Sequence, residues 1–212
     1  TNSFYEGAYA AVAHYKNSAL AANVYLYDVT AVADAYWIDA SMTMAGIKAT
    51  AIYAGMNTKG KMAALDDTDG FALSASTTVA SVNLMAAYSQ VSDVATGKSG
   101  LPLANTATAF KKTKLPTAGV YTDGVYVADE DTKAFKVKAS TKLAGTGIAL
   151  QYVDNDNGSN NTKDTQEIDL ILSKKLGDVN MKAIVLNRDF DDATTDQASG
   201  GTHVRVIASV DF

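Results

Sequence analysis

In the last ten residues, 203–212, apolar and polar side chains alternate so regularly that the pattern predicts one kind of secondary structure. Every second side chain is apolar, at Val204, Val206, Ala208, Val210 and Phe212. The intervening positions are mostly polar, at His203, Arg205, Ile207, Ser209 and Asp211. Because side chains alternate faces along a β-strand, this pattern predicts a strand with one apolar and one largely polar face. Its length of about ten residues is typical of a strand that crosses a bilayer.

The same alternation recurs along the whole chain and predicts about eleven strands. The windows are 5–16, 20–29, 34–44, 47–57, 71–79, 81–90, 132–143, 147–153, 165–176, 180–190 and 203–212, with a twelfth strand considered at 119–127. Short turns alternate with longer polar connections at 58–70, 91–131, 154–164 and 191–202. Outer-membrane barrels sort their connections in this way. We therefore predict an all-β fold, an antiparallel up-and-down transmembrane β-barrel, as a single domain over residues 1–212 with a long extracellular loop at 91–131.

Composition removes several classes of protein. The chain has 212 residues and no Cys, so it offers neither a disulfide scaffold nor a thiolate metal site. Its net charge of -5 argues against nucleic acid as a partner, because such proteins normally carry a basic surplus. No run of 18 apolar residues is present, which excludes a transmembrane helix but not a barrel, whose strands are apolar only at alternate positions.

Charged residues fall on the face opposite the apolar one. A charge facing lipid near the membrane midplane costs about 2–4 kcal/mol for Lys or Arg, whereas a watery lumen accepts it at little cost. The strand at 132–143 shows this most clearly, with three lysines on one face and Phe135, Val137 and Leu143 on the other. Parity predicts the following pore-lining residues: Lys136, Lys138, Lys142, Glu167, Asp169, Lys175, Lys182, Arg188, Arg205 and Asp211.

Aromatic side chains gather on the apolar face near one edge of the predicted sheet. In an antiparallel sheet the starts of odd strands and the ends of even strands share an edge. The residues at that edge are Tyr36, Tyr53, Phe71, Tyr88, Phe135 and Tyr152. Such rings prefer the interface between lipid and water, so we predict an aromatic girdle. Trp37 falls on the polar face instead, which indicates either packing against loop material or a shift of the strand register at this point.

The stretch 18–56, SALAANVYLYDVTAVADAYWIDASMTMAGIKATAIYAGM, resembles the middle of Opr-type outer-membrane porins, including the major porins of ε-proteobacteria. The resemblance implies that the chain is the C-terminal half of a barrel of about 16–18 strands with an inward-folded constriction loop, usually in the N-terminal half. It also implies a ladder of basic residues that guides anionic groups, for which Lys136, Lys138, Lys142, Lys182, Arg188 and Arg205 have the right parity. Glu167 and Asp169 interrupt that ladder.

Other motifs give weaker signals. The segment 95–100, ATGKSG, lacks the first Gly of a phosphate-binding loop and its strand–loop–helix context. The loop at 154–164 resembles a calcium loop, but Gly158 is one residue early, so a solvated polar loop is favoured over a Ca²⁺ site. The two histidines, His14 and His203, are accompanied by no Cys and no nucleophile elbow. No cofactor, metal site or catalytic residue is therefore predicted.

The sequence predicts a porin of the Gram-negative outer membrane that passes small hydrophilic or ionic solutes by diffusion. The expected partners are outer-membrane lipids and lipopolysaccharide, small solutes, further copies in a homotrimer, and the barrel-assembly machinery, which would recognise Phe212. An odd strand count with a periplasmic C-terminus leads us to expect that N-terminal strands are missing. The alternative is a secreted or surface β-rich structural protein that self-assembles through open sheet edges.

Overall fold

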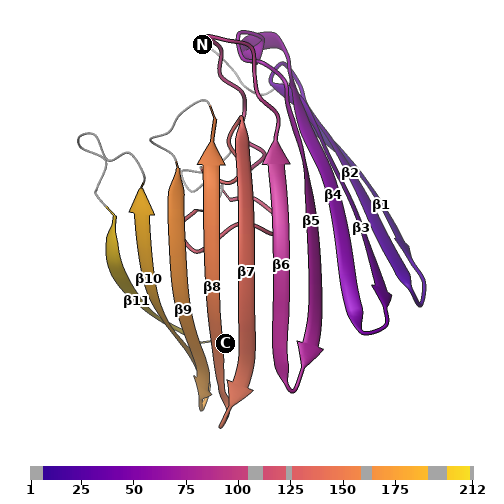
Figure 1. Ribbon diagram of the computed structural model, residues 1–212. Coiled ribbons are helices and arrows are strands. Elements are labelled where there is room, and N and C mark those ends of the chain that lie inside the picture. The colour runs from indigo at the N-terminus through magenta and orange to yellow at the C-terminus, as the bar shows by residue number, and fades with distance from the viewer. Residues whose placement is uncertain (1–6, 105–111, 123–125, 159–163, 191–199, 211–212) are drawn as a thin grey trace.

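A computed structural model shows one antiparallel sheet of eleven strands in sequence order (Figure 1). It describes residues 7–104, 112–122, 126–158, 164–190 and 200–210. The strands are β1 (Ala8–Lys16), β2 (Leu20–Val29), β3 (Ala33–Met44), β4 (Ile47–Thr58), β5 (Thr68–Val79), β6 (Val82–Val91), β7 (Thr132–Leu143), β8 (Thr146–Asn157), β9 (Thr165–Leu176), β10 (Val179–Phe190) and β11 (Gly201–Val210).

The only helical turn in these ranges is η1 (Gly60–Met62). No helix of the described residues is long and apolar enough to cross a membrane. The expected strand order and the expected number of strands are confirmed. A twelfth strand at 119–127 is absent from the described residues 119–122 and 126–127.

Tight turns join the strands at one edge of the sheet, which we call the short-turn edge. Ala45 and Gly46 both have positive φ, as do Ala144 and Gly145. Two positive φ angles in a two-residue loop are the conformation of a type I′ turn, whose twist matches that of the flanking strands. The longer connections, at 30–32, 59–67, 92–131, 158–164 and 191–200, join strands at the opposite edge, which we call the long-connection edge.

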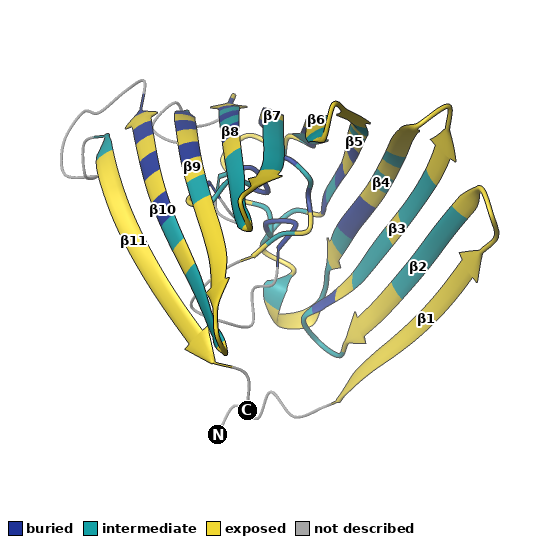
Figure 2. Cartoon of the chain, turned by 90° about the horizontal axis from the view of Figure 1, so that it is seen from below, coloured by how far each residue is buried: buried dark blue, intermediate teal, exposed yellow. Residues whose placement is uncertain are grey.

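The sheet curves into an arc that is open between its two edge strands, β1 and β11 (Figure 2). Both edge strands run from the long-connection edge to the short-turn edge. Each antiparallel pairing reverses the strand direction, and the ten pairings between β1 and β11 return it to the starting direction. Direct pairing of β1 with β11 would therefore be parallel, and the eleven strands alone do not make a closed antiparallel barrel. The described parts of the connection between β6 and β7 lie inside the arc (Figure 2).

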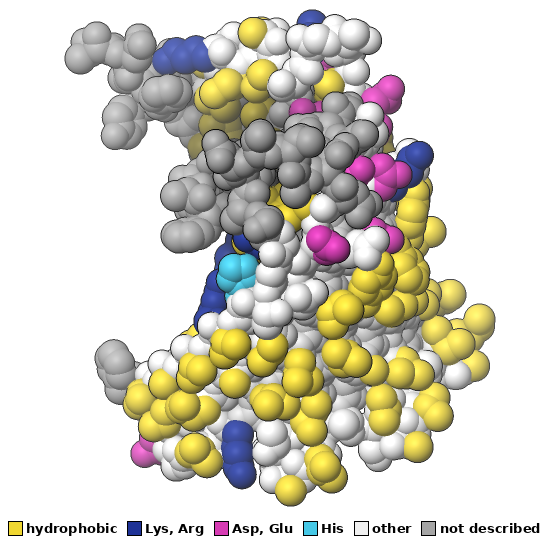
Figure 3. Space-filling view, turned by 60° about the vertical axis from the view of Figure 1, so that its left-hand side comes forward, with side chains coloured by type: hydrophobic (Ala, Val, Ile, Leu, Met, Phe, Trp, Pro, Cys, Tyr) yellow, Lys and Arg dark blue, Asp and Glu magenta, His cyan; other side chains and the backbone are white. Residues whose placement is uncertain are grey.

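The outer, convex face is apolar. Val204 is 69% exposed and Val206 is 66% exposed, and large apolar side chains are exposed on the other strands too. Figure 3 shows a broad band of hydrophobic side chains on this face, with Lys and Arg side chains at its margin beside a histidine. Monomeric soluble proteins rarely expose a contiguous apolar patch of more than a few hundred Å². The band is therefore suited to contact with lipid.

The register of β10 and β11 allows the two faces to be tested directly. Val206 lies opposite Ala183 and faces outward, whereas Ser209 lies opposite Asn180 on the concave face. We expect Val206→Arg to block folding into lipid vesicles, because a cation on the lipid face costs about 2–4 kcal/mol. Ser209→Arg should fold, as measured by heat-modifiable mobility on a gel. Equal behaviour of the two variants would contradict this register.

Candidate functional site: an inward-folded segment on the concave face

Residues 92–131, which we call the inner segment, connect β6 to β7, and the described parts of the segment, 92–104, 112–122 and 126–131, lie over the concave face of the sheet (Figure 2). Apolar residues of the segment pack against small side chains of the inward-facing wall. The buried cluster comprises Leu103, Ala104, Leu115 and Ala128 of the segment with Ala54, Ala72 and Val91 of the strands. The sequence predicted the length of this connection but not its inward course.

The inward position of Trp37 is explained by this cluster. Its ring faces inward on β3 and packs against the same cluster, together with Ile52 and Met56. The inward parity of this tryptophan is therefore confirmed, with no shift of register, and its ring packs against the cluster that the wall and the segment share. Gly70 lies in the same contact, where a Cβ would come within 2.9 Å of Leu103 Cδ1 and 2.7 Å of Gln90 O. The absence of a side chain there lets the segment approach the wall.

A second apolar contact is formed on the other side of the segment. Val127 packs against Ala134 of β7 and Val153 of β8, with Ala118 beside them. Val127 and Val153 are fully buried. The segment is thus held by apolar packing on strands β4–β6 and again on β7–β8, and it spans the inside of the arc between them.

The strongest polar anchor is Glu167 of β9. Its carboxylate accepts hydrogen bonds from the backbone N–H groups of Val120 at 2.6 Å, Tyr121 at 2.9 Å and Thr122 at 2.7 Å. The side chain is 0% exposed. A buried carboxylate needs such donors, because removal from water destabilises its charged form unless hydrogen bonds replace the lost hydration.

Asp169 supports this anchor from the next inward position of β9. Its Oδ2 accepts a hydrogen bond from Gln151 Nε2 at 2.6 Å and a longer one from the Val120 N–H at 3.2 Å. Two further contacts fix the neighbouring residues of the segment. Ser89 Oγ lies 2.6 Å from Thr117 Oγ1, and Lys136 Nζ donates to Ala118 O at 2.5 Å.

Arg188 of β10 completes the anchor from the side. Its guanidinium lies 3.6 Å from the centroid of the Tyr121 ring and 5.3 Å from that of Phe190. Tyr126 contacts both rings, with centroids 5.6 Å from Tyr121 and 6.0 Å from Phe190. Stacking of Arg on an aromatic face stabilises both partners where water is excluded.

The predicted pore-lining residues all have the expected parity where they are described, but they divide into two groups. Four are buried under the inner segment: Lys136, Glu167, Asp169 and Arg188. The others remain accessible on the concave face: Lys138, Lys142, Lys175, Lys182 and Arg205. Asp211 lies outside the described residues, as does Phe212. The described accessible set is entirely basic, because Glu167 and Asp169, the two described carboxylates of the predicted set, belong to the buried group.

The six predicted girdle residues lie on the convex face near the long-connection edge. Adjacent rings contact each other in two pairs, Tyr36 with Tyr53 at 5.5 Å and Phe71 with Tyr88 at 6.0 Å between centroids. Phe135 lies opposite Tyr88 in the register, and Tyr152 lies opposite Val137. Their position is that of a girdle, and their contact with a membrane interface stays a prediction.

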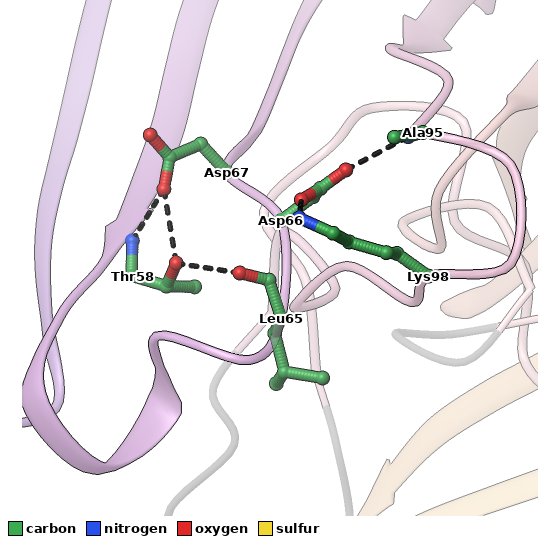
Figure 4. Close-up of polar contacts among 6 residues, drawn as sticks. All are labelled: Thr58, Leu65, Asp66, Asp67, Ala95 and Lys98. Carbon is green, nitrogen blue, oxygen red and sulfur yellow. Dashed lines mark hydrogen bonds and ion pairs between the residues drawn. The ribbon is translucent and has the colours of Figure 1, made fainter.

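A separate carboxylate, that of Asp66, tethers the inner segment at the long-connection edge (Figure 4). Asp66, in the connection before β5, accepts hydrogen bonds from the Ala95 N–H at 2.8 Å and from Lys98 Nζ at 2.6 Å. Its own N–H donates to Ser99 O at 3.0 Å. The ATGKSG turn is therefore a docking point for this aspartate. Lys98 and the Ala95 N–H hold the pKa of Asp66 below its ordinary value.

The connection that carries Asp66 is itself fixed to the end of β4 (Figure 4). Asp67 Oδ1 accepts a hydrogen bond from the Thr58 N–H at 2.7 Å, and Thr58 Oγ1 lies 2.9 Å from Leu65 O. Lys59 joins this region to the neighbouring strands through ion pairs of 2.6 Å with Asp28 and Asp34. Two connections and the ends of β2, β3 and β4 are thus linked into one rim.

A hydrogen-bonded chain on β1–β3 was not foreseen from the sequence. His14 Nδ1 lies 2.7 Å from Asn23 Oδ1, and Asn23 Nδ2 donates to Asp39 Oδ1 at 2.7 Å. The three residues are aligned by register on the concave face, where His14 lies opposite Asn23 and Asn23 opposite Asp39. Their spacing in the sequence gives no sign of this contact, because each residue lies on a different strand.

The described residues contain no group of three or more His, Cys, Asp or Glu that could hold a metal ion. In the loop at 154–164, the Asn157 N–H donates to Asp164 Oδ1 at 2.6 Å. Residues 159–163 of that loop lie outside the described part of the chain. The calcium alternative stays a prediction.

Comparison with known proteins identifies the fold. No family model and no curated protein matches the sequence. Among solved structures, the chain is similar to OccK3 (OpdO) of Pseudomonas aeruginosa, with a TM-score of 0.74 and 16% identity over 94% of this chain and 55% of that one. OprD of the same organism has a TM-score of 0.67 and 13% identity, over 95% of this chain and 59% of that one. OccAB4 of Acinetobacter baumannii has a TM-score of 0.70 and 14% identity, over 96% of this chain and 52% of that one.

These neighbours are outer-membrane porins of the OprD/Occ family, and the eleven-stranded sheet matches part of their β-barrel fold. The chain spans about 55% of the length of the first of them, OccK3. The predicted fold class is confirmed by this likeness together with the strand order.

The Asp66 tether makes the rim sensitive to acid. The folded state lowers the pKa of Asp66, so its stabilising effect is fully present above the ordinary range of an aspartate, about pH 4, and is lost as the pH falls through the lowered value. We expect the Ala95 amide to be protected from hydrogen exchange at neutral pH and to lose protection in strong acid, after correction for intrinsic rates. In Asp66→Asn, the Ala95 amide should lack this protection at all pH values.

Asp93→Asn is a matched control for that experiment. It removes the same charge from the same segment, and Asp93 makes no hydrogen bond or ion pair with the described residues. Protection of the Ala95 amide should be unchanged in this variant. Equal loss in the two variants would show that general charge, rather than the Asp66 contact, governs the rim.

Proposed function

We propose that this chain forms the wall and the constriction of a passive diffusion channel in the outer membrane of a Gram-negative bacterium. The observation that carries the proposal is the inner segment, which docks on the concave face and narrows the space inside the arc. The apolar convex face supports a lipid environment, and the likeness to porin structures supports the class. Selection of solutes in such a channel depends on pore width and wall charge, and no bond is made or broken.

The electrostatics of the concave face favour small anionic solutes. Glu167 and Asp169 would oppose anions if they faced open water, but the inner segment covers both. Among the described residues, the charged side chains on the accessible wall of β7–β11 are then all cations, namely Lys138, Lys142, Lys175, Lys182 and Arg205. On β1–β4 the same face carries Lys16, Lys48 and Asp39. A lumen lined by one sign of charge concentrates solutes of the opposite sign.

The partners follow from this assignment. Outer-membrane lipids and lipopolysaccharide would contact the convex face, and small solutes would pass along the concave one. Assembly as a homotrimer and recognition of Phe212 by the barrel-assembly machinery remain predictions from the sequence. The narrower resemblance to the major porins of ε-proteobacteria rests on the stretch 18–56 and also remains a prediction.

Ion selectivity in planar bilayers tests the proposal. We expect the wild-type protein, folded from detergent, to conduct ions and to give a reversal potential of the anion-selective sign in a salt gradient. Lys138→Glu combined with Lys182→Glu should lower the ratio of anion to cation permeability by roughly threefold to tenfold, because both charges lie on the accessible wall.

Lys174→Glu is the matched control, since Lys174 lies on the convex face of the same strand as Lys175. It reverses one of the same kind of charge outside the lumen, so it matches either single replacement, Lys138→Glu or Lys182→Glu, and it should leave selectivity unchanged. A protein that is soluble without detergent and does not conduct would contradict the channel and favour the β-rich structural alternative. A conducting protein whose selectivity responds equally to Lys174 and Lys138 would contradict the basic wall.

A further inference from the structure

Three consecutive backbone N–H groups of the inner segment converge on one carboxylate. Glu167 Oε1 accepts from Val120 and Tyr121, and Oε2 accepts from Thr122 at 2.7 Å and from Tyr121 at 3.1 Å. Both oxygens of the carboxylate are therefore used, and the side chain is fully buried. Successive N–H groups pointing into one concavity form an anion-binding site of a kind that proteins use for free anions.

The backbone around this carboxylate is closely fitted to it. A Cβ at Gly119 would lie 2.7 Å from Glu167 Oε1 and 2.6 Å from Thr122 Oγ1, so no side chain has room there. The Gly119 N–H donates to Thr122 Oγ1 at 3.1 Å, which closes the turn on its other side. The turn at 118–122 is thus shaped as a binding site, and the wall supplies its ligand.

Charged groups from three strands surround the site. Asp169 of β9 contributes a second carboxylate, whose Oδ1 has no hydrogen-bond partner among the described residues. Lys136 of β7 donates to Ala118 O, and Arg188 of β10 lies opposite Glu167 in the register. Two basic residues thus lie on strands near the two carboxyl groups.

We propose that the N–H groups of Val120, Tyr121 and Thr122 form a carboxylate-binding site whose resident ligand is Glu167. Occupation of this site fixes the inner segment against the wall and sets the width of the channel. Glu167 is a positioning residue, because it acts on the solute through the segment that it holds. This inference deepens the proposed function and depends on it for the readout of channel width, whereas the binding site itself can be tested without conduction.

The test is replacement of the resident carboxylate by a soluble one. Glu167→Ala removes the carboxylate and leaves space for a small molecule next to the three N–H groups. We expect this variant to show a larger and noisier single-channel conductance than the wild type. Acetate should restore the wild-type conductance, and acetamide should not, because it has the same shape but no charge. Glu167→Gln, which keeps the shape of the side chain, should behave as Glu167→Ala does without acetate.

Asp156→Ala is the matched control, since it removes an exposed carboxylate from the convex face of β8. Its conductance should be that of the wild type, with no response to acetate. The proposal is overturned if Glu167→Ala conducts as the wild type does, or if acetate and acetamide act alike. If Glu167→Ala folds only in acetate, the proposal is supported. Failure to fold in both additives overturns it.

Hydrogen exchange separates this inference from the proposed function. In detergent, the amides of residues 120–122 should be protected in the wild type, exposed in Glu167→Ala, and protected again by acetate but not by acetamide. This result would support the binding site even if the wild-type protein carried no current, in which case the proposed function alone would fail. Unchanged protection in Glu167→Ala would overturn the site whatever the conductance.

Discussion

Pairing of backbone N–H and C=O groups between neighbouring strands is the constraint on which the rest of this structure depends. Unpaired backbone groups in lipid are too costly to survive, so a membrane wall must be built from helices or from a continuous sheet. Here ten antiparallel pairings join eleven strands, and their register fixes which side chains face outward. The apolar convex face and the polar concave face both follow from that register.

The strands and their faces could be predicted because alternation is a local property. Parity alone placed Tyr152 outward and Lys138 inward, and it identified Trp37 as an exception, although it left open whether the ring packs against loop material or the register shifts. The short turns were equally visible, since Ala-Gly pairs interrupt the alternation at 45–46 and 144–145. A shift of one residue in any strand would have reversed every such assignment, so agreement along the sheet is a strong test of the pattern.

The course of the inner segment could not be predicted, because it depends on contacts between residues far apart in the chain. Glu167 and Asp169 looked like wall charges that interrupt a basic series. In the structure they bind a backbone turn far earlier in the chain, since Val120 precedes Glu167 by 47 residues. The free N–H groups of a loop leave no trace in the sequence. The consequence is chemical as well as structural, since covering these two carboxylates leaves the accessible wall basic.

Docking of the inner segment inside the sheet is the central claim, and a disulfide tests it most directly because the chain has no native Cys. Ser89 Oγ and Thr117 Oγ1 lie 2.6 Å apart, so Ser89→Cys with Thr117→Cys should form a disulfide in the folded, membrane-embedded protein. Ser140→Cys with Thr117→Cys should not. Oxidation of the first pair with unchanged conductance is the predicted result, and its failure to cross-link in folded protein would contradict the account.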